Sequence, residues 1–131
     1  MLPITWSTVR LFVHVMAATV WVGGQLTLAA LVPALRAAGP EVPRTAAQAF
    51  NRVAWVAYGV LIFTGLWNIL VIEPTWDSAY GRTLMLKLVF VVLSGVTAFL
   101  HARAKSRRAL AVLGAASGIS ALAIIFLAVQ L

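Results

Sequence analysis

The fold is decided by residues 11–35, which read LFVHVMAATVWVGGQLTLAALVPAL and contain no charged side chain. A helix needs roughly 20 apolar residues to cross the hydrocarbon core of a bilayer, and this run is longer than that. It is also longer than the apolar core of a cleaved signal peptide. We therefore expect it to stay in the chain as a first membrane span, bounded by Arg10 and Arg36.

The rest of the chain has the same apolar character. Its 131 residues are 63% hydrophobic and only 10% charged, and the mean hydropathy is +1.00. Ten Lys and Arg side chains against three Asp and Glu give a formal charge of +7, and the charges cluster between apolar runs. This distribution excludes a nucleic-acid-binding protein with a solvated basic face and indicates contact with the lipid bilayer. The absence of cysteine excludes disulfides, iron–sulfur clusters, c-type haem attachment and thiolate metal sites.

Turn and capping signals divide the chain into helices. Gly39-Pro40 predicts the end of the first helix, with the glycine in the left-handed conformation, and Pro33 predicts a kink just before it. Thr45 and Gln48 have the spacing of a capping box, so the second helix is predicted to start there and to end at Glu73-Pro74. The third helix is predicted to begin near Arg82.

These signals predict an all-α fold, an integral membrane four-helix bundle in a single transmembrane domain that covers residues 1–131. The short basic connection at 103–108 makes the last two helices antiparallel neighbours. Seven glycines, including Gly114-x-x-x-Gly118, predict close helix approach. The predicted spans are residues 8–36, 47–72, 83–104 and 109–130.

The charge distribution predicts the orientation. Seven Lys and Arg residues lie in or beside the connections at 36–52 and 103–108, whereas three lie on the opposite side. By the positive-inside rule, the N and C termini are both outside the cytoplasm. We therefore expect a multi-pass protein of the bacterial cytoplasmic (inner) membrane with extracytoplasmic termini.

Three polar side chains from three helices are predicted to share one depth. With a rise of about 1.5 Å per residue, His14, Asn68 and Lys87 each lie roughly 10 Å from the middle of their span toward the outer face. His101, the second histidine, lies roughly 20 Å from His14 along the membrane normal, so one metal ion cannot bind both in a monomer. The spacing of Arg10, His14 and Trp21 places them on one face of the first helix.

Three segments resemble a known family. They are His14-Val-Met-Ala-Ala-Thr-Val-Trp21-Val-Gly-Gly, Thr64-Gly-Leu-Trp67 and Tyr80-Gly-Arg82-Thr-Leu-Met-Leu-Lys87, and they resemble the CopD-like (copper-resistance D) membrane proteins. More distantly, they are similar to the HemJ-type protoporphyrinogen oxidases, another four-span architecture with an intramembrane His and Lys. The resemblance covers about residues 11–103, and the fourth helix adds nothing distinctive. It implies copper uptake for one family and haem-assisted porphyrin oxidation for the other.

The polar layer favours a haem-b-linked redox function in the outer half of the bilayer. A neutral imidazole at His14 suits haem iron, with its second ring nitrogen oriented by a neighbour such as Asn68. Basic side chains would meet the propionates, and the sixth position is open, filled by water, or taken by Lys87 or Met85. His14 as a purely structural hydrogen-bonding residue, and Lys87 reaching to the interface as a solvated amine, are the alternatives. The candidate cofactor-binding residues are His14, Lys87, Asn68, Arg10, Arg82, Trp21 and His101.

Two further functions remain open. Copper transport or handling has the candidate ligand set His14, Met16 and Met85, but Met16 is on nearly the opposite helix face from His14, which ranks copper second. The chain is alternatively a small anchoring or assembly subunit of a larger membrane complex, and its glycine-rich faces permit a homodimer. His101 is interpreted as an interfacial residue, with a second haem as the alternative. Whether the chain is an enzyme, such as a haem-dependent oxidoreductase, or an electron-transfer protein stays open.

Overall fold

Every long charge-free run of the sequence forms a helix in the computed structural model, which describes residues 1–131. α1, a π-helical segment η1 and α2 follow one another without a break, so four helices are long and apolar enough to cross a membrane. No strand is present, which confirms the all-α fold with four membrane-length helices. The elements are α1 (Trp6–Ala18), η1 (Thr19–Gly23), α2 (Gly24–Ala38), α3 (Val42–Ile72), α4 (Ala79–Arg103) and α5 (Arg107–Val129).

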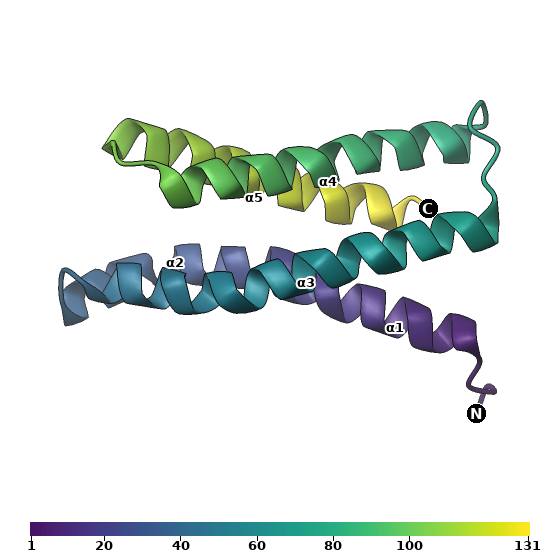
Figure 1. Ribbon diagram of the computed structural model, residues 1–131, viewed down its shortest axis with the longest axis horizontal. Helices are drawn as coiled ribbons and strands as arrows, with labels where there is room; N and C mark the ends of the chain where they lie inside the picture. The colour runs from purple at the N-terminus through teal and green to yellow at the C-terminus, as the bar shows by residue number, and fades with distance from the viewer. The chain divides into compact units, whose positions relative to one another are not determined.

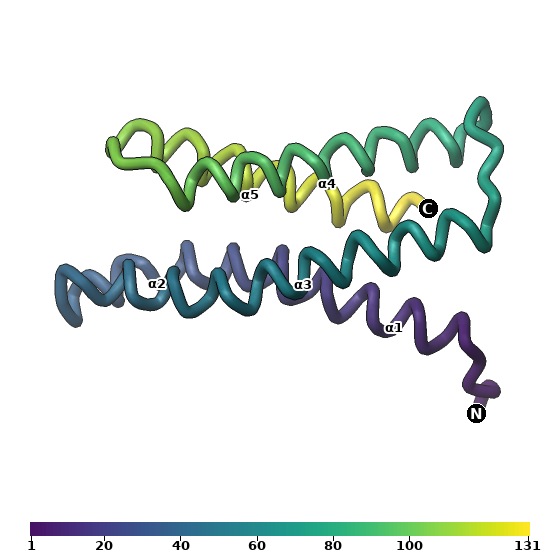
Figure 2. Tube along the Cα trace, viewed as in Figure 1, coloured from purple at the N-terminus to yellow at the C-terminus, as the bar shows by residue number.

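The helices form two compact units, Met1–Ile72 and Glu73–Leu131. In the first unit, α1, η1 and α2 run along α3 in the opposite direction (Figure 1). In the second unit, α4 and α5 form a tight antiparallel hairpin, whose two arms are easily followed in the tube of Figure 2. The antiparallel pairing predicted from the short basic connection is therefore confirmed, while the single transmembrane domain stays a prediction.

The second helix begins earlier than the sequence predicted. α3 starts at Val42, and the Thr45 hydroxyl donates to the Glu41 carbonyl at 3.2 Å, so Thr45 lies inside the first turn. The predicted capping box at Thr45 and Gln48 is therefore wrong. The physical reason is Pro43, since proline has no N–H to leave unpaired and its fixed φ already suits the first turn of a helix.

Serine caps also start the last two helices earlier than predicted. α4 begins at Ala79 because the Ser78 hydroxyl accepts a hydrogen bond from the Gly81 amide at 3.0 Å. α5 begins at Arg107 because the Ser106 hydroxyl accepts from the Ala109 amide at 3.1 Å. The pattern of apolar residues does not reveal a polar capping residue that lies outside the apolar run.

Two proline-containing signals stop helices as predicted. α2 continues through Pro33 and ends at Ala38 before Gly39-Pro40, and α3 ends at Ile72 before Glu73-Pro74. Gly39, however, has φ 160° and ψ 153°, which is extended backbone, so the left-handed conformation predicted for it is wrong. A residue that precedes proline is restricted to extended conformations, and this restriction outweighs the usual glycine geometry at a helix end.

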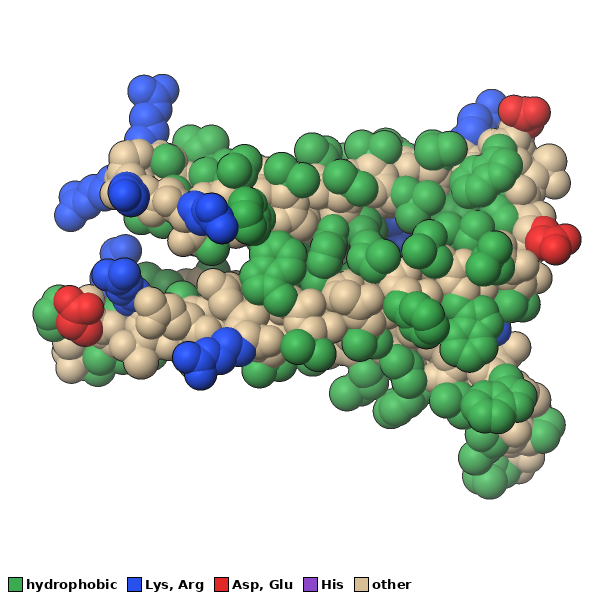
Figure 3. Space-filling view, in the orientation of Figure 1, with side chains coloured by type: hydrophobic (Ala, Val, Ile, Leu, Met, Phe, Trp, Pro, Cys, Tyr) green, Lys and Arg blue, Asp and Glu red, His purple; other side chains and the backbone are tan.

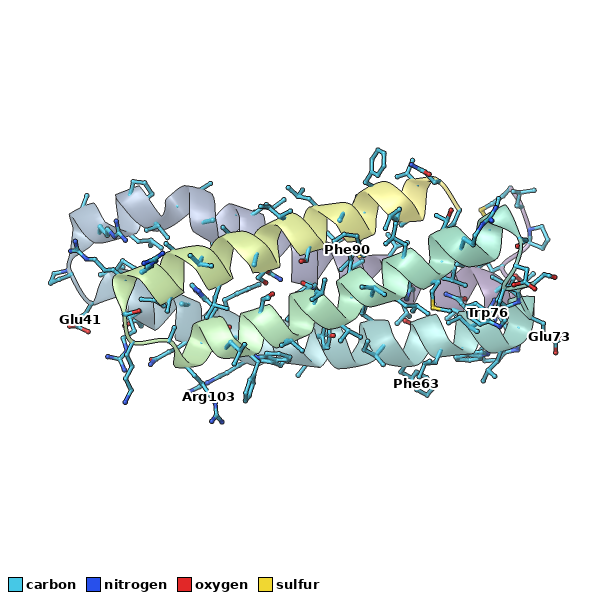
Figure 4. The ribbon with its side chains drawn as sticks, turned by 90° about the horizontal axis from the view of Figure 1, so that it is seen from above. Glu41, Phe63, Glu73, Trp76, Phe90 and Arg103 are labelled. Carbon is cyan, nitrogen blue, oxygen red and sulfur yellow. The ribbon has the colours of Figure 1, made fainter.

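Many buried positions hold small or hydroxyl side chains, whereas most large apolar side chains are exposed. Buried residues of the second unit include Ser94, Ser117, Ser120 and Ala121. Phe63 is 66% exposed and projects from α3 (Figure 4), and apolar side chains cover much of the visible surface (Figure 3). Small residues at helix contacts with bulky apolar residues outside are typical of helices packed in lipid.

The glycines differ in how closely other parts of the chain approach them. A Cβ atom at Gly24 would lie 2.3 Å from Cε2 of Phe50, so this glycine permits close packing of α2 on α3. A Cβ at Gly114 would lie 3.1 Å from the His101 ring, whereas Gly59 and Gly118 have no atom within 4 Å. Only the first glycine of the Gly114-x-x-x-Gly118 pair therefore makes the close approach that we predicted for both.

Candidate functional site

Two polar pairs join α1 to α3 in the first unit. Nε of Arg10 donates to Oδ1 of Asn68, and Nδ1 of His14 lies 2.7 Å from Oγ1 of Thr64. Both residues on α1 and both on α3 are four apart, and residues with that spacing share one face of a helix. Because the helices are antiparallel, the two pairs form successive rungs. We call Arg10, His14, Thr64 and Asn68 the polar ladder.

Hydrogen bonding within the polar ladder favours one tautomer of His14. The Thr64 hydroxyl has one proton, and it donates that proton to the Val60 carbonyl at 2.7 Å. With that proton engaged, Thr64 Oγ1 can accept from His14, and the tautomer that fits this arrangement has its hydrogen on Nδ1 and its lone pair on Nε2. Fixing one ring nitrogen as a donor is how proteins commonly orient a histidine whose other nitrogen binds a metal ion.

Burial makes this hydrogen bond important for stability. Thr64 is only 3% exposed, and His14 is half-buried. Gly65 lies beside the imidazole, and a Cβ atom there would be 3.4 Å from Cε1 of His14. The ring is thus held by a hydrogen bond on one edge and by close packing next to the α3 backbone.

Arg10 adds a positive charge one helical turn from His14. The residue is 8% exposed, and its guanidinium lies 5.7 Å from the centre of the Trp67 ring as well as on Asn68. A buried guanidinium is costly unless hydrogen bonds and aromatic faces replace water, and both are present here. The polar ladder therefore places a histidine next to a buried positive charge.

An aromatic cluster continues the same face toward α2. Trp21, only 2% exposed, has its ring centre 4.5 Å from that of Tyr58 and 5.3 Å from that of Trp55. The π-helical segment Thr19–Gly23 holds Trp21, and π-helical turns of this kind recur near functional sites. Trp21 is therefore a packed core residue where η1 meets α3.

Four further predicted residues lie in the second unit. Arg82 is exposed in the first turn of α4, Met85 is 51% exposed, and Lys87 is half-buried on the same helix. His101 packs against Gly114, and its Nδ1 is buried without a hydrogen-bond partner. The common layer of His14, Asn68 and Lys87 stays a prediction, because Lys87 belongs to the other unit.

Sequence reasoning missed Thr64 and misassigned Asn68. We expected Asn68 to orient the His14 ring, but Thr64 holds Nδ1 and Asn68 accepts from Arg10. A signal for Thr64 was present, since it lies four residues before Asn68 just as Arg10 lies four residues before His14. Matching polar spacings on two antiparallel helices would have predicted both pairs.

The metal-binding capacity of the chain is limited. No group of three or more His, Asp or Glu side chains comes together, and cysteine is absent. Met16, the nearest sulfur ligand in sequence, is 49% exposed, whereas the His14 ring lies against α3. A copper ion at His14 would therefore have few protein ligands within the first unit.

Comparison with known proteins identifies the family. The family described as copper resistance protein D (CopD) matches residues 44–131. The chain belongs to the CopD family. It is also similar to the copper transport protein CutJ of Bacillus subtilis (strain 168), with 37% identity over 108 residues. That match covers 74% of this chain and 19% of CutJ, so the chain spans less than a fifth of the length of this relative. No solved structure matches the chain at a significant level.

The CopD match refines the resemblance. It confirms the copper-resistance D family, and it includes α5, in which we saw nothing distinctive. The match begins at Arg44 and so contains Thr64 and Asn68 of the polar ladder but not Arg10 or His14. With four membrane-length helices and a bacterial relative, this CopD protein is a bacterial multi-pass membrane protein in contact with lipid.

Proposed function

We propose that this CopD-family chain handles copper within the membrane, with His14 as a ligand of the transported ion. The observation that carries the proposal is the 2.7 Å contact between His14 Nδ1 and Thr64 Oγ1, which favours the tautomer with its lone pair on Nε2. Neutral imidazole binds copper well, and the family and its relative CutJ are both named for copper. Copper, which the sequence alone ranked second, is therefore the better supported function.

The positive charge of the polar ladder suits brief binding of a copper ion in transit rather than tight storage of it. Arg10 repels a cation at His14, and transport requires sites weak enough to release their ion. His14 with few other protein ligands also agrees with brief binding, since tightly held structural metals use several. We infer that copper pauses at His14 while it crosses the outer half of the bilayer.

A copper-binding measurement tests the proposal. The full chain in detergent is titrated with Cu(I) under anaerobic conditions against a chromophoric chelator. We expect His14→Gln to remove most of the binding, because it deletes the imidazole ligand, and His101→Gln to have a much smaller effect. Binding that persists in His14→Gln and disappears in His101→Gln would refute the assignment of His14. Copper accumulation in cells that express each variant provides the transport readout.

Haem b is the second candidate, and the buried Arg10 favours it. Histidine is a common axial ligand of haem iron, and a guanidinium one turn away would neutralise a propionate. No comparison refers to haem. A visible absorption spectrum of the purified chain decides the matter: a Soret band that His14→Gln abolishes supports haem, and its absence with stoichiometric Cu(I) binding supports copper.

We also propose that both termini are extracytoplasmic. The basic residues gather at the α2–α3 and α4–α5 connections, and such excess marks cytoplasmic loops. Because the chain has no cysteine, single cysteines can be introduced without background. We expect Thr75→Cys to react with an impermeant maleimide in intact cells and Ala104→Cys to react only after the membrane is opened. The reverse pattern would invert the orientation.

A further inference from the structure

The connection between α4 and α5 concentrates positive charge in the second unit. Within residues 103–108, four of six side chains are cationic, and all four are exposed. No Asp or Glu follows Asp77 in the sequence, so no carboxylate within the hairpin neutralises them. Figure 3 shows Lys and Arg side chains at this end of the hairpin and the acidic side chains of the unit at the opposite end. We call Arg103, Lys105, Arg107 and Arg108 the basic tip.

The start of α5 increases the positive potential of the basic tip. Arg107 and Arg108 occupy the first turn of α5, which contains no acidic residue. Unpaired amides give the beginning of a helix a partial positive charge, so cations are unfavourable there. The Ser106 hydroxyl accepts from only one of these amides, that of Ala109. An external anion would therefore relieve both the like-charge repulsion and the unpaired helix amides.

Arg103 locates the basic tip at the lipid-facing surface. Its guanidinium lies 4.5 Å from the centre of the Phe99 ring, and that ring is 46% exposed. The Phe99 ring belongs to the apolar outer surface of α4, so the cation lies where apolar chain meets polar headgroup. Figure 4 shows Arg103 projecting at the end of α4 opposite Glu73 and Trp76.

We propose that the basic tip binds the headgroups of anionic phospholipids in the adjacent leaflet. The tip joins two membrane-length helices, α4 and α5, so we expect it to lie at the level of the lipid phosphates. Basic clusters beside membrane spans attract anionic lipid, and guanidinium groups bind phosphate through paired hydrogen bonds. The surface is separate from the polar ladder, and the proposal does not depend on copper binding.

Lipid retention by the purified full chain tests the proposal. The chain in mild detergent is offered an equimolar mixture of phosphatidylglycerol and phosphatidylcholine, and the bound lipids are counted by native mass spectrometry. We expect wild type to retain phosphatidylglycerol preferentially. Each cation near an anionic surface contributes roughly fivefold to binding at low salt, so R107Q/R108Q is expected to weaken phosphatidylglycerol binding by roughly 25-fold. R107K/R108K keeps the charge and is expected to recover most of the preference.

Arg82→Gln is the matched control. Arg82 is an exposed arginine in the first turn of α4, but Glu73 and Asp77 precede it and offset its charge. Its loss should leave phosphatidylglycerol retention within about twofold of wild type, since one offset cation contributes less than the fivefold of a full one. Equal retention of both lipids by wild type, an equal effect of R82Q and R107Q/R108Q, or displacement of phosphatidylglycerol by millimolar inorganic phosphate would overturn the proposal. Helical circular dichroism of each variant confirms that the fold is retained.

Discussion

Thr64→Val tests the orientation of His14 most directly, because valine has nearly the shape of threonine but cannot accept a hydrogen bond. Thr64 is 3% exposed, and its Oγ1 lies 2.7 Å from His14 Nδ1. Leaving a buried donor without its acceptor costs about 1–3 kcal/mol, so we expect a destabilisation of that size. The lost bond from Thr64 to the Val60 carbonyl adds little, since that carbonyl still accepts the helical amide.

Thr64→Val should lower the copper affinity as well as the stability of the chain. A residue that orients a metal-binding histidine typically contributes 10- to 100-fold to metal affinity, so we expect a Cu(I) affinity lower by about that factor. The unfolding free energy is measured by denaturant titration in micelles, and the affinity by competition with a chelator. Thr64→Ser retains the hydroxyl and should restore affinity to near the wild-type value.

Thr97→Val provides the control for this experiment. Thr97 also lies within a helix and donates to the carbonyl four residues earlier, Leu93, at 2.6 Å, but it has no histidine partner among its hydrogen bonds. We expect its replacement to change stability by less than about 1 kcal/mol and to leave copper affinity unchanged.

The ring nitrogens of His14 can be observed separately. In a His101→Gln background only one imidazole remains, and 15N shifts distinguish protonated from unprotonated ring nitrogens. We expect Nδ1 to bear the hydrogen in the parent chain and a mixed population in Thr64→Val. A parent spectrum in which Nε2 bears the hydrogen would refute the reasoning, whatever the copper affinity proves to be.

Three further substitutions test the packing and charge of the chain. Gly24→Ala places a Cβ 2.3 Å from the Phe50 ring, so it should destabilise the chain by about 1–3 kcal/mol in micelles, and Phe50→Leu should recover part of the loss. Gly81→Ala places a Cβ 2.3 Å from the Thr75 carbonyl oxygen, and backbone atoms cannot move aside as a side chain can. We expect the α3–α4 connection to open and to become sensitive to limited proteolysis. Arg10→Met removes a buried charge beside His14 and should tighten Cu(I) binding in the chelator assay, by up to roughly 100-fold.

The sequence predicted the helices well because their signal is long and repeated. Residues 11–35 contain no charged side chain and are long enough to span a membrane. Gly39-Pro40 and Glu73-Pro74 are strong signals for the ends of helices. The errors in the helix bounds lie at helix starts. At Thr45 the capping pattern was present, but Pro43 had already begun the helix, and a local pattern cannot show which of two signals acts first.

The site was harder to predict because it depends on the register between helices. Depth along each span placed His14 and Asn68 at one level, and both belong to the polar ladder, yet one turn of difference decides which side chain touches which. Lys87, predicted at the same depth, lies in the other unit. Thr64 was missed because threonine is common in apolar helices and normally hydrogen bonds its own backbone. The π-helical segment Thr19–Gly23 was also missed, since no residue pattern in it differs from an ordinary helix.

Arg10 separates the two functions considered for this site, because its charge acts on them with opposite signs. Side chains four apart on a helix have Cβ atoms about 6 Å apart, and at an effective dielectric of about 20 two unit charges at that distance repel by about 3 kcal/mol. Removing the guanidinium would therefore strengthen the binding of a copper ion at His14. A haem at the same histidine would instead lose the partner of its propionate and bind less tightly. Since one substitution strengthens copper binding and weakens haem binding, Arg10→Met distinguishes the two ligands even if both bind the purified chain.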